Sequence, residues 1–250
     1  TKGNVFLRVQ QIDKFRENGL ELTKNTLAAK FSNTSQVIKR TLHDNAELRD
    51  DADIRKTLDV LFSGIEKVFE AESVEEAVGI EGNCAQSYFS IFNKLITNKK
   101  VPFTFEFRSK RPPLDPINAV LSFVYTLSAS ECASALETVG LDSYIGFCHS
   151  LRSGRTSLAH DLVEEVRCLA ERFTLTLFNL QILGEKDFER QISGAVWLND
   201  DGRKKVLSRW QERKRSDIIH PVLKQKIPVG LLPYVQSNLL AKYVSCLLYT

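Results

Sequence analysis

The chain has 250 residues, 43% of them hydrophobic, which is enough to bury one large core or two small ones. Its 34 basic and 31 acidic residues give a formal net charge of only +3, so there is no global signal of a polyanion binder and any nucleic-acid contact must come from local patches. The five cysteines are scattered without a CxxC pair, which argues against a disulfide-stabilised secreted domain and indicates a reduced, cytoplasmic compartment. Charges at Lys2, Arg8 and Asp13 interrupt the first residues, so no signal peptide is expected.

The segment NVFLRV, residues 4–9, is predicted to be a short strand. Helical periodicity dominates the rest of the chain, so the fold is expected to be all-α apart from this strand. We predict an amphipathic helix over residues 20–39 and a second over residues 53–70. A third helix is predicted to begin after Ser73, because Ser73 and Glu76 have the spacing of a capping box.

The middle of the chain combines a proline-rich loop with its most apolar helix. Residues 100–115 contain three prolines and a basic cluster, so they are expected to form a surface loop. Asp115 and Pro116 match an N-cap followed by proline at the first helical position. The next run, residues 117–136, has about the length of a membrane span, but its four serines, asparagine and glutamate predict a buried core helix instead.

The C-terminal third is predicted to contain three more helices. Thr156 or Ser157 is expected to cap a long helix that runs to about residue 183. On this helix Asp161 and Glu164 lie off the apolar stripe but only three residues apart, so both carboxylates can point into one cavity if other segments cover their face. A strongly basic helix is predicted over residues 200–220, followed by a turn at KIPVGLLP and a last apolar helix.

Four potential metal ligands lie beside small and apolar residues in the segments GIEGNCAQSYF and GFCHSLRSGRTSLAHDLVEE. They are Glu81, His149, Asp161 and Glu164. Three carboxylates and one imidazole suit a Mg²⁺ or Mn²⁺ phosphodiester site, because hard cations take oxygen ligands while Mn²⁺ also tolerates one nitrogen. These residues therefore predict metal-dependent chemistry on a nucleic-acid backbone.

Each of these residues also has a simpler interpretation. Glu81 is also explained as a helix-end charge that interacts with the helix dipole, and His149 as a hydrogen-bonded core residue. Asp161 and Glu164 fit the solvated face of an acidic helix equally well.

The dipeptide His160-Asp161 allows a different metal site, that of the HD phosphohydrolases. Such a site needs a further upstream histidine, and His43 would have to supply it from a charged stretch that is expected to be exposed. His160 and Glu164 are four residues apart and share a helix face, so helical geometry is compatible with this alternative.

Four blocks of the sequence, spread over about residues 1–245, resemble the CRISPR-associated spacer-acquisition integrase and endonuclease, here called the Cas-one family. The blocks are GIEGNCAQSYF, FRSKRPPLDPINAVLSFVYTL, GFCHSLRSGRTSLAHDLVEE, and IIHPVL with KIPVGLLPYVQSNLLAKYV. The resemblance implies that Glu81, His149 and Glu164 hold the metal and that Asp161 is an additional active-site acid, which orients a metal-bound water or takes a proton. His160 falls where the family usually has an aliphatic residue and is not carried over.

The resemblance also implies an activity and its partners. The expected protein is a Mg²⁺- or Mn²⁺-dependent DNA endonuclease and integrase that inserts short foreign DNA segments, or spacers, into a CRISPR array. A 3′ hydroxyl or water would attack a DNA phosphodiester. The implied partners are DNA (prespacer and CRISPR repeat), a second copy in a homodimer of the full-length protein, and a small Cas-two protein. No membrane partner is expected.

The family carries an N-terminal β-sandwich domain that builds much of its dimer interface. Of this domain only the linking strand at NVFLRV is expected here, so residues 1–18 are predicted to be a linker and strand remnant and residues 19–250 the helical catalytic domain. The chain contains no methionine, not even at position 1, and is expected to be a fragment.

Three basic clusters are candidate DNA contacts, although a run of charge is usually only a solvated face. The proline loop carries Lys99, Lys100, Arg108, Lys110 and Arg111, the loop beside His149 carries Arg152 and Arg155, and the basic helix carries Arg203, Arg209 and Arg213 around Trp210. A second hypothesis needs no catalysis. In it the chain is a helical DNA-binding or scaffolding module whose acidic cluster is structural, and dependence on a divalent metal separates the two hypotheses.

Overall fold

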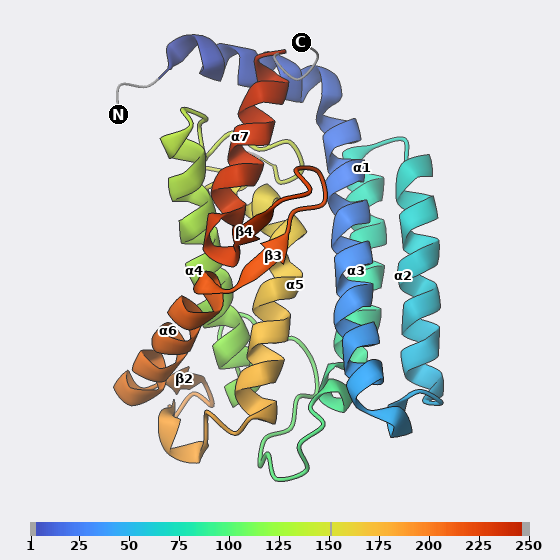
Figure 1. The fold of residues 1–250 in the computed structure, drawn as a ribbon, viewed down its shortest axis with the longest axis vertical. Helices are drawn as coiled ribbons and strands as arrows, with labels where there is room; N and C mark the ends of the chain where they lie inside the picture. The colour runs from blue at the N-terminus through green and yellow to red at the C-terminus, as the bar shows by residue number, and fades with distance from the viewer. Residues whose placement is uncertain (1–3, 151, 247–250) are drawn as a thin grey trace.

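The computed structural model describes residues 4–150 and 152–246, and within them the fold is helical, as expected (Figure 1). The helices are α1 (Val5–Asp44), α2 (Ala52–Glu70), α3 (Val74–Ser90), α4 (Pro116–Thr138), α5 (Ser157–Asn179), α6 (Asp200–Arg215) and α7 (Leu232–Val244). Strand in this described part is limited to two antiparallel hairpins, β1 (Phe188–Arg190) with β2 (Val196–Leu198) and β3 (Asp217–Ile219) with β4 (Lys226–Pro228). Short 3₁₀ turns lie at Ala46–Leu48, Phe92–Leu95, Glu185–Asp187 and Val229–Leu231.

Local capping signals determine where helices α3 and α4 begin. The Ser73 hydroxyl accepts a hydrogen bond from the backbone N of Glu76 at 3.1 Å and so begins α3. Asp115 caps α4 in the same way, and Pro116 is the first residue of that helix. The basic helix α6 ends at Arg215, earlier than expected, because the next residues form strand β3.

The predicted strand at residues 4–9 is wrong, because this segment is the beginning of α1. The side chain of Asn4 caps the helix by accepting from the backbone N of Leu7 at 3.1 Å. Leu7, Gln11 and Phe15 then recur at helical spacing and are buried. The residues expected to link a strand to the helical domain therefore form one continuous helix with residues 19–44.

The central helix of the molecule is α5, which lies between α1 and α4, while α2 and α3 pack on the other side of α1 (Figure 1). α7 packs against α4 and crosses near the first turns of α1. The candidate membrane span is α4, which is long and apolar enough to cross a bilayer by composition alone. It packs instead against α5 and α7, as predicted for a core helix.

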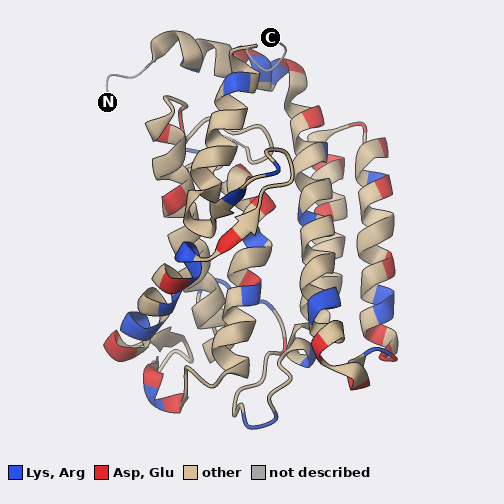
Figure 2. Cartoon of the chain, in the orientation of Figure 1, with Lys and Arg blue, Asp and Glu red and all other residues tan. Residues whose placement is uncertain are grey.

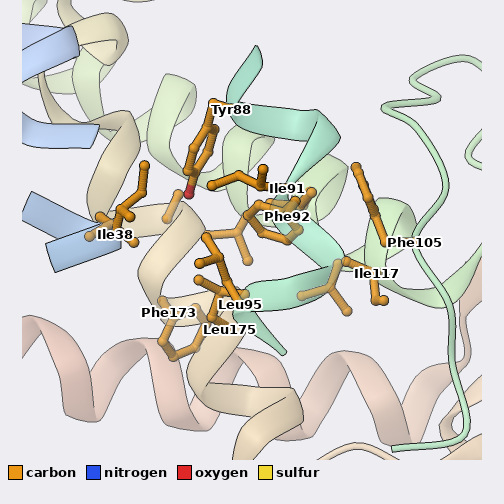
Figure 3. Packing of buried hydrophobic residues seen from close by; sticks show 14 of the residues in the cluster. Ile38, Tyr88, Ile91, Phe92, Leu95, Phe105, Ile117, Phe173 and Leu175 are labelled. Carbon is orange, nitrogen blue, oxygen red and sulfur yellow. The ribbon is translucent and has the colours of Figure 1, made fainter. Parts of the chain in front are cut away.

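Two apolar clusters lie one above the other along these helices. The first joins α2, α3, α6, the second half of α1, the beginning of α4 and the end of α5, and Figure 3 shows its packing around Tyr88, Phe92 and Phe173. The second joins the first turns of α1, the end of α4, the beginning of α5 and α7. Helices α1, α4 and α5 thus belong to both clusters, and on α5 the boundary falls between Val166 and Ala170.

Candidate active site

A lysine ammonium lies between two of the predicted metal-binding carboxylates. Lys30 on α1 donates to Glu164 Oε2 on α5 at 2.5 Å and also to Glu81 Oε1 on α3. The Lys30 side chain is only 9% exposed, like that of Glu164, while Glu81 is 23% exposed. Three helices that are far apart in the sequence thus bring two carboxylates to one cation.

Glu164 is held ionised by two cations. Its second oxygen, Oε1, accepts from Arg167 Nη1 at 2.6 Å. Burial by itself would raise the pKa of Glu164, but the charges of Arg167 and Lys30 outweigh it and hold the pKa well below 4.5. Burial would likewise lower the pKa of Lys30, but Glu164 and Glu81 raise it above 10.5. Near neutral pH the site therefore holds an ammonium ion between carboxylates.

Tyr125 packs against the guanidinium of Arg167 and holds it in position. The guanidinium of Arg167 lies over the ring of Tyr125, 4.4 Å from its centroid. The Tyr125 hydroxyl donates to Glu171 Oε1 at 2.8 Å, and burial raises the pKa of Glu171. We call Lys30, Glu81, Glu164, Arg167 and Glu171 the charged layer, since on α5 it lies at the boundary between the two apolar clusters.

His149 is oriented from behind by Asp161. Asp161 is fully buried and accepts from the His149 ring Nδ1 at 2.6 Å. Its two oxygens also accept from the backbone N of Phe147, Cys148 and His149 at 2.7, 3.1 and 2.9 Å. With Nδ1 committed to a carboxylate, Nε2 is the other ring nitrogen, and no residue of the described ranges hydrogen-bonds to it. This arrangement is usual for a histidine that binds a metal.

A glycine makes this arrangement possible. A Cβ atom at Gly146 would lie 2.5 Å from Asp161 Oδ2 and 2.9 Å from Ser157 Cβ. Any side chain at this position would therefore push the loop away from the start of α5. The segment GFCH needs glycine at its first position for close approach, and not for an unusual φ angle.

Within residues 4–150 and 152–246, the compact group of potential ligands is Cys148, His149 and Asp161, whose ligand atoms all lie within 4.8 Å of one another. Asp161 is saturated by backbone and imidazole donors, and burial raises the pKa of the Cys148 thiol to about 12. Both features disfavour this trio as a site for a hard cation. Glu81 and Glu164 do not belong to this compact group. Lys30 connects them to each other, and His149 contributes to lowering the pKa of Glu164.

Several simpler interpretations of these residues are wrong. Glu81 lies in the middle of α3 and is not a helix-end charge. Asp161 and Glu164 are buried, so they are not a solvated face of α5. Asp161 lies behind His149, where it positions the ring.

The two histidines that an HD-type site would need, His43 and His160, have separate partners. His160 Nδ1 lies 2.8 Å from the carbonyl O of Thr156, and the His160 ring stacks edge-on against His149 at 5.9 Å. The side chain of His43 is 75% exposed at the end of α1 and pairs with Asp44. Neither contact brings His43 to His160.

The candidate DNA contacts are in part engaged within the chain. Arg111 and Arg152 are exposed, whereas Arg155 Nη2 donates to the carbonyl of Ser150 at 2.6 Å. Arg108 turns inward, where it donates to Asn118 Oδ1 at 2.7 Å and to Ser122 Oγ at 3.0 Å.

Figure 2 shows the basic residues of α6 on the outside of the molecule. Arg203 donates to the carbonyl of Leu198 at 2.9 Å, Arg209 pairs with Glu212 at 2.8 Å, and Arg213 donates to Ser216 Oγ at 2.5 Å. Trp210, predicted to lie among the DNA contacts, is instead buried against Phe173, with ring centroids 5.0 Å apart.

The sequence prediction missed Lys30 and Arg167. One signal for Lys30 is present in the sequence: it recurs at helical spacing with Thr23, Leu27 and Thr34, all of which are buried on α1. A lysine on the core-facing side of a helix requires a buried acid as partner. Arg167 follows Glu164 by three residues, the spacing of a helical ion pair.

Comparison with known proteins places this chain in a family. The family model for CRISPR associated protein Cas1 matches residues 1–212. A CRISPR-associated endonuclease Cas1 from Moorella thermoacetica is 40% identical over 243 residues, which cover 96% of this chain and 71% of that protein.

Solved structures share the fold. A casposase bound to its integration product superposes with a TM-score of 0.84 at 24% identity, covering 97% of this chain and 66% of the casposase. A partial Cas6-RT-Cas1–Cas2 complex contains a chain with a TM-score of 0.79 at 23% identity, covering 99% of this chain and 71% of that one. The match to the family model and the identity to a Cas1 endonuclease confirm the resemblance to the Cas-one family, and the chain belongs to the CRISPR-associated Cas1 family.

Proposed function

We propose that this chain is the catalytic part of a metal-dependent DNA endonuclease and integrase that inserts spacers into a CRISPR array. One observation carries the proposal: Glu81 and Glu164, from two separate helices, already share a buried cation, the ammonium of Lys30. A pair of carboxylates that gathers around a positive charge is suited to a divalent metal ion.

The donor set fits Mg²⁺ or Mn²⁺. Glu81 and Glu164 offer carboxylate oxygens, and His149 offers Nε2 because Asp161 occupies Nδ1. Two oxygens and one imidazole nitrogen suit a hard cation that accepts a nitrogen ligand. When bound there, the metal would neutralise negative charge on a DNA phosphodiester and would lower the pKa of the attacking 3′ hydroxyl or water.

The protein's own residues then have distinct roles in this proposal. Asp161 fixes the His149 ring and its tautomer through the Nδ1 contact. Arg167 keeps Glu164 ionised and oriented through Oε1. Arg152 and Arg155, in the loop after His149, would hold the anionic backbone beside the site.

The proposed partners follow from the relatives. DNA is the first, as prespacer and CRISPR repeat, since the casposase structure contains an integration product. A Cas2 protein is the second, because Cas1 and Cas2 occur together in a solved complex that contains this fold. A homodimer of the full-length protein is the third. Arg111, Arg203, Arg209 and Arg213 are proposed DNA contacts outside the charged layer.

Metal titration of the isolated protein tests the proposal. Mn²⁺ should raise the melting temperature of the wild type, because a ligand that binds only the native state stabilises it. Glu81→Ala should abolish this shift and the cleavage of branched DNA. The matched control is Glu75→Ala, which removes an exposed acid from the first turn of the same helix. An equal Mn²⁺ shift in wild type and Glu81→Ala would instead favour the noncatalytic DNA-binding module.

A further inference from the structure

We propose that Lys30 is a built-in competitor for the divalent metal: its ammonium occupies the cation position between Glu81 and Glu164, and metal binding displaces it. The inference rests on the proposed function, because it assigns the same two carboxylates to the metal. It adds that Lys30, a residue of α1, lowers the affinity of the site for the divalent metal.

The competition follows from which oxygens are engaged. Glu164 has two carboxylate oxygens, and Arg167 binds Oε1 while Lys30 binds Oε2. Arg167 is anchored by Tyr125, so it stays on Oε1. A metal at Oε1 would have to compete with this anchored guanidinium, so Oε2, which Lys30 holds, is the oxygen better placed to bind it.

Glu81 leads to the same conclusion. Its Oε1 also contacts the Lys30 ammonium, so this single group contacts both of the carboxylates that are proposed to hold the metal. A divalent ion and an ammonium at one position repel each other, and the buried surroundings weaken this repulsion little. One of the two cations must leave.

Lysine is suited to leave. Its ammonium ends a flexible four-carbon chain and has no rigid bidentate geometry, unlike the Arg167 guanidinium on the neighbouring oxygen. The described hydrogen bonds of the Lys30 ammonium are those to Glu81 and Glu164 alone. Displacement therefore needs no other polar contact to break.

The opposite possibility is that Lys30 keeps the two carboxylates in position while the metal is bound. The two ideas predict opposite changes in metal affinity when the ammonium is removed. A competitor weakens binding, so its removal tightens it. A lysine that positions the carboxylates strengthens metal binding, so its removal weakens metal binding.

Calorimetric Mn²⁺ titration of Lys30 variants separates them. Lys30→Met should bind Mn²⁺ with a Kd about tenfold lower than wild type, within the usual range for coupling between two binding events. Lys30→Arg retains the charge and should bind no more tightly than wild type. The matched control Lys39→Met removes an exposed lysine from the same helix and should leave the Kd unchanged.

A Kd for Lys30→Met that equals or exceeds that of wild type would overturn the inference while leaving the proposed metal site intact. Absence of Mn²⁺ binding from both proteins would refute the metal site itself. A measurement on wild type covers the case in which Lys30→Met does not fold. The side-chain ¹⁵N signal of Lys30 should shift on addition of diamagnetic Mg²⁺ as the ion pair breaks, and an unmoved signal in Mg²⁺-saturated protein would contradict displacement.

Discussion

Asp161 binds His149 twice, through the ring Nδ1 at 2.6 Å and the backbone N at 2.9 Å, both on the same oxygen, Oδ1. Asp161→Asn should keep the side-chain shape but replace one of the two carboxylate oxygens, both of which accept from N–H groups, by a donor amide. The imidazole would lose its fixed tautomer, so Mn²⁺ affinity should fall about 10- to 100-fold. Isothermal titration measures this, with circular dichroism as the check on folding. Unchanged affinity would show that Asp161 does not orient a ligand.

Gly146 is expected to be as important for metal binding as the proposed ligands. Gly146→Ala places a Cβ 2.5 Å from Asp161 Oδ2, so the loop must move and the hydrogen bonds of Asp161 to the backbone of Phe147 and Cys148 should weaken. We expect weaker Mn²⁺ binding and a loss of about 1–3 kcal/mol in stability.

The control for Gly146→Ala is Gly82→Ala, beside Glu81, where no atom lies within 4 Å of an added Cβ. That variant should gain up to about 1 kcal/mol, because alanine is the better helix former. Equal effects of the two substitutions in urea unfolding would contradict the crowding argument.

Two glutamates of α5 should have opposite effects on the pH dependence of stability. Folding lowers the pKa of Glu164 below 4.5, because Arg167 and Lys30 outweigh the effect of burial. Its stabilising contribution is therefore complete above about pH 4.5 and is lost as the pH falls further. Glu164→Gln should flatten the acid limb of the stability curve and cost about 3–5 kcal/mol at neutral pH by leaving buried cations uncompensated.

Glu171 is expected to change the stability in the opposite direction as the pH rises. Burial raises its pKa above 4.5, and its Oε2 has no partner in the described part of the chain. Ionising this group costs stability as the pH rises, so Glu171→Gln should steepen the acid limb and leave the protein at least as stable at pH 7. Urea unfolding at a series of pH values from about 3.5 to about 7 tests both variants. If Glu171→Gln also flattens the plot of stability against pH, folding favours the ionised form of Glu171, and the expected effect of burial is wrong.

The basic helix α6 is expected to contact the DNA backbone. Replacing Arg209 and Arg213 together by glutamine should lower the slope of log affinity against log salt by about two units, because each phosphate that the protein neutralises adds about 0.9 to that slope. The internal partners of these arginines, Glu212 and Ser216, must yield for the arginines to reach DNA. Fluorescence anisotropy with labelled DNA gives the slope. A slope that does not change would leave α6 as a solvated face and favour Lys110 and Arg111 of the proline loop.

How far the sequence predicts this fold depends on how local each signal is. Ser73 and Asp115 indicate the starts of α3 and α4, because a cap is made by residues three apart. Residues 4–9 are mistaken for a strand because four apolar residues in six satisfy a strand as well as a helix, and only packing of Leu7 against distant residues decides between them.

In the candidate site, too, some features depend on local sequence and others on contacts between distant residues. The sequence predicts four candidate site residues from their segments: Glu81, His149, Asp161 and Glu164. Their roles depend on contacts between residues that are distant in sequence. Lys30 is 51 and 134 residues away from its two partners, and Asp161 is 12 residues away from His149. For Trp210, local sequence leads to a wrong prediction. Its basic neighbours suggest an exposed aromatic, while burial against Phe173 depends on how α6 meets α5.

The division of the interior into two apolar clusters has a consequence for how the protein accommodates ligands. Helices α1, α4 and α5 contribute apolar side chains to both clusters, and on α5 the charged layer lies where one cluster gives way to the other. A cation that enters this layer is therefore expected to replace ion pairs while both apolar clusters stay closed. The side chains of the charged layer would then rearrange around the new cation, and the helices that carry them would keep their positions.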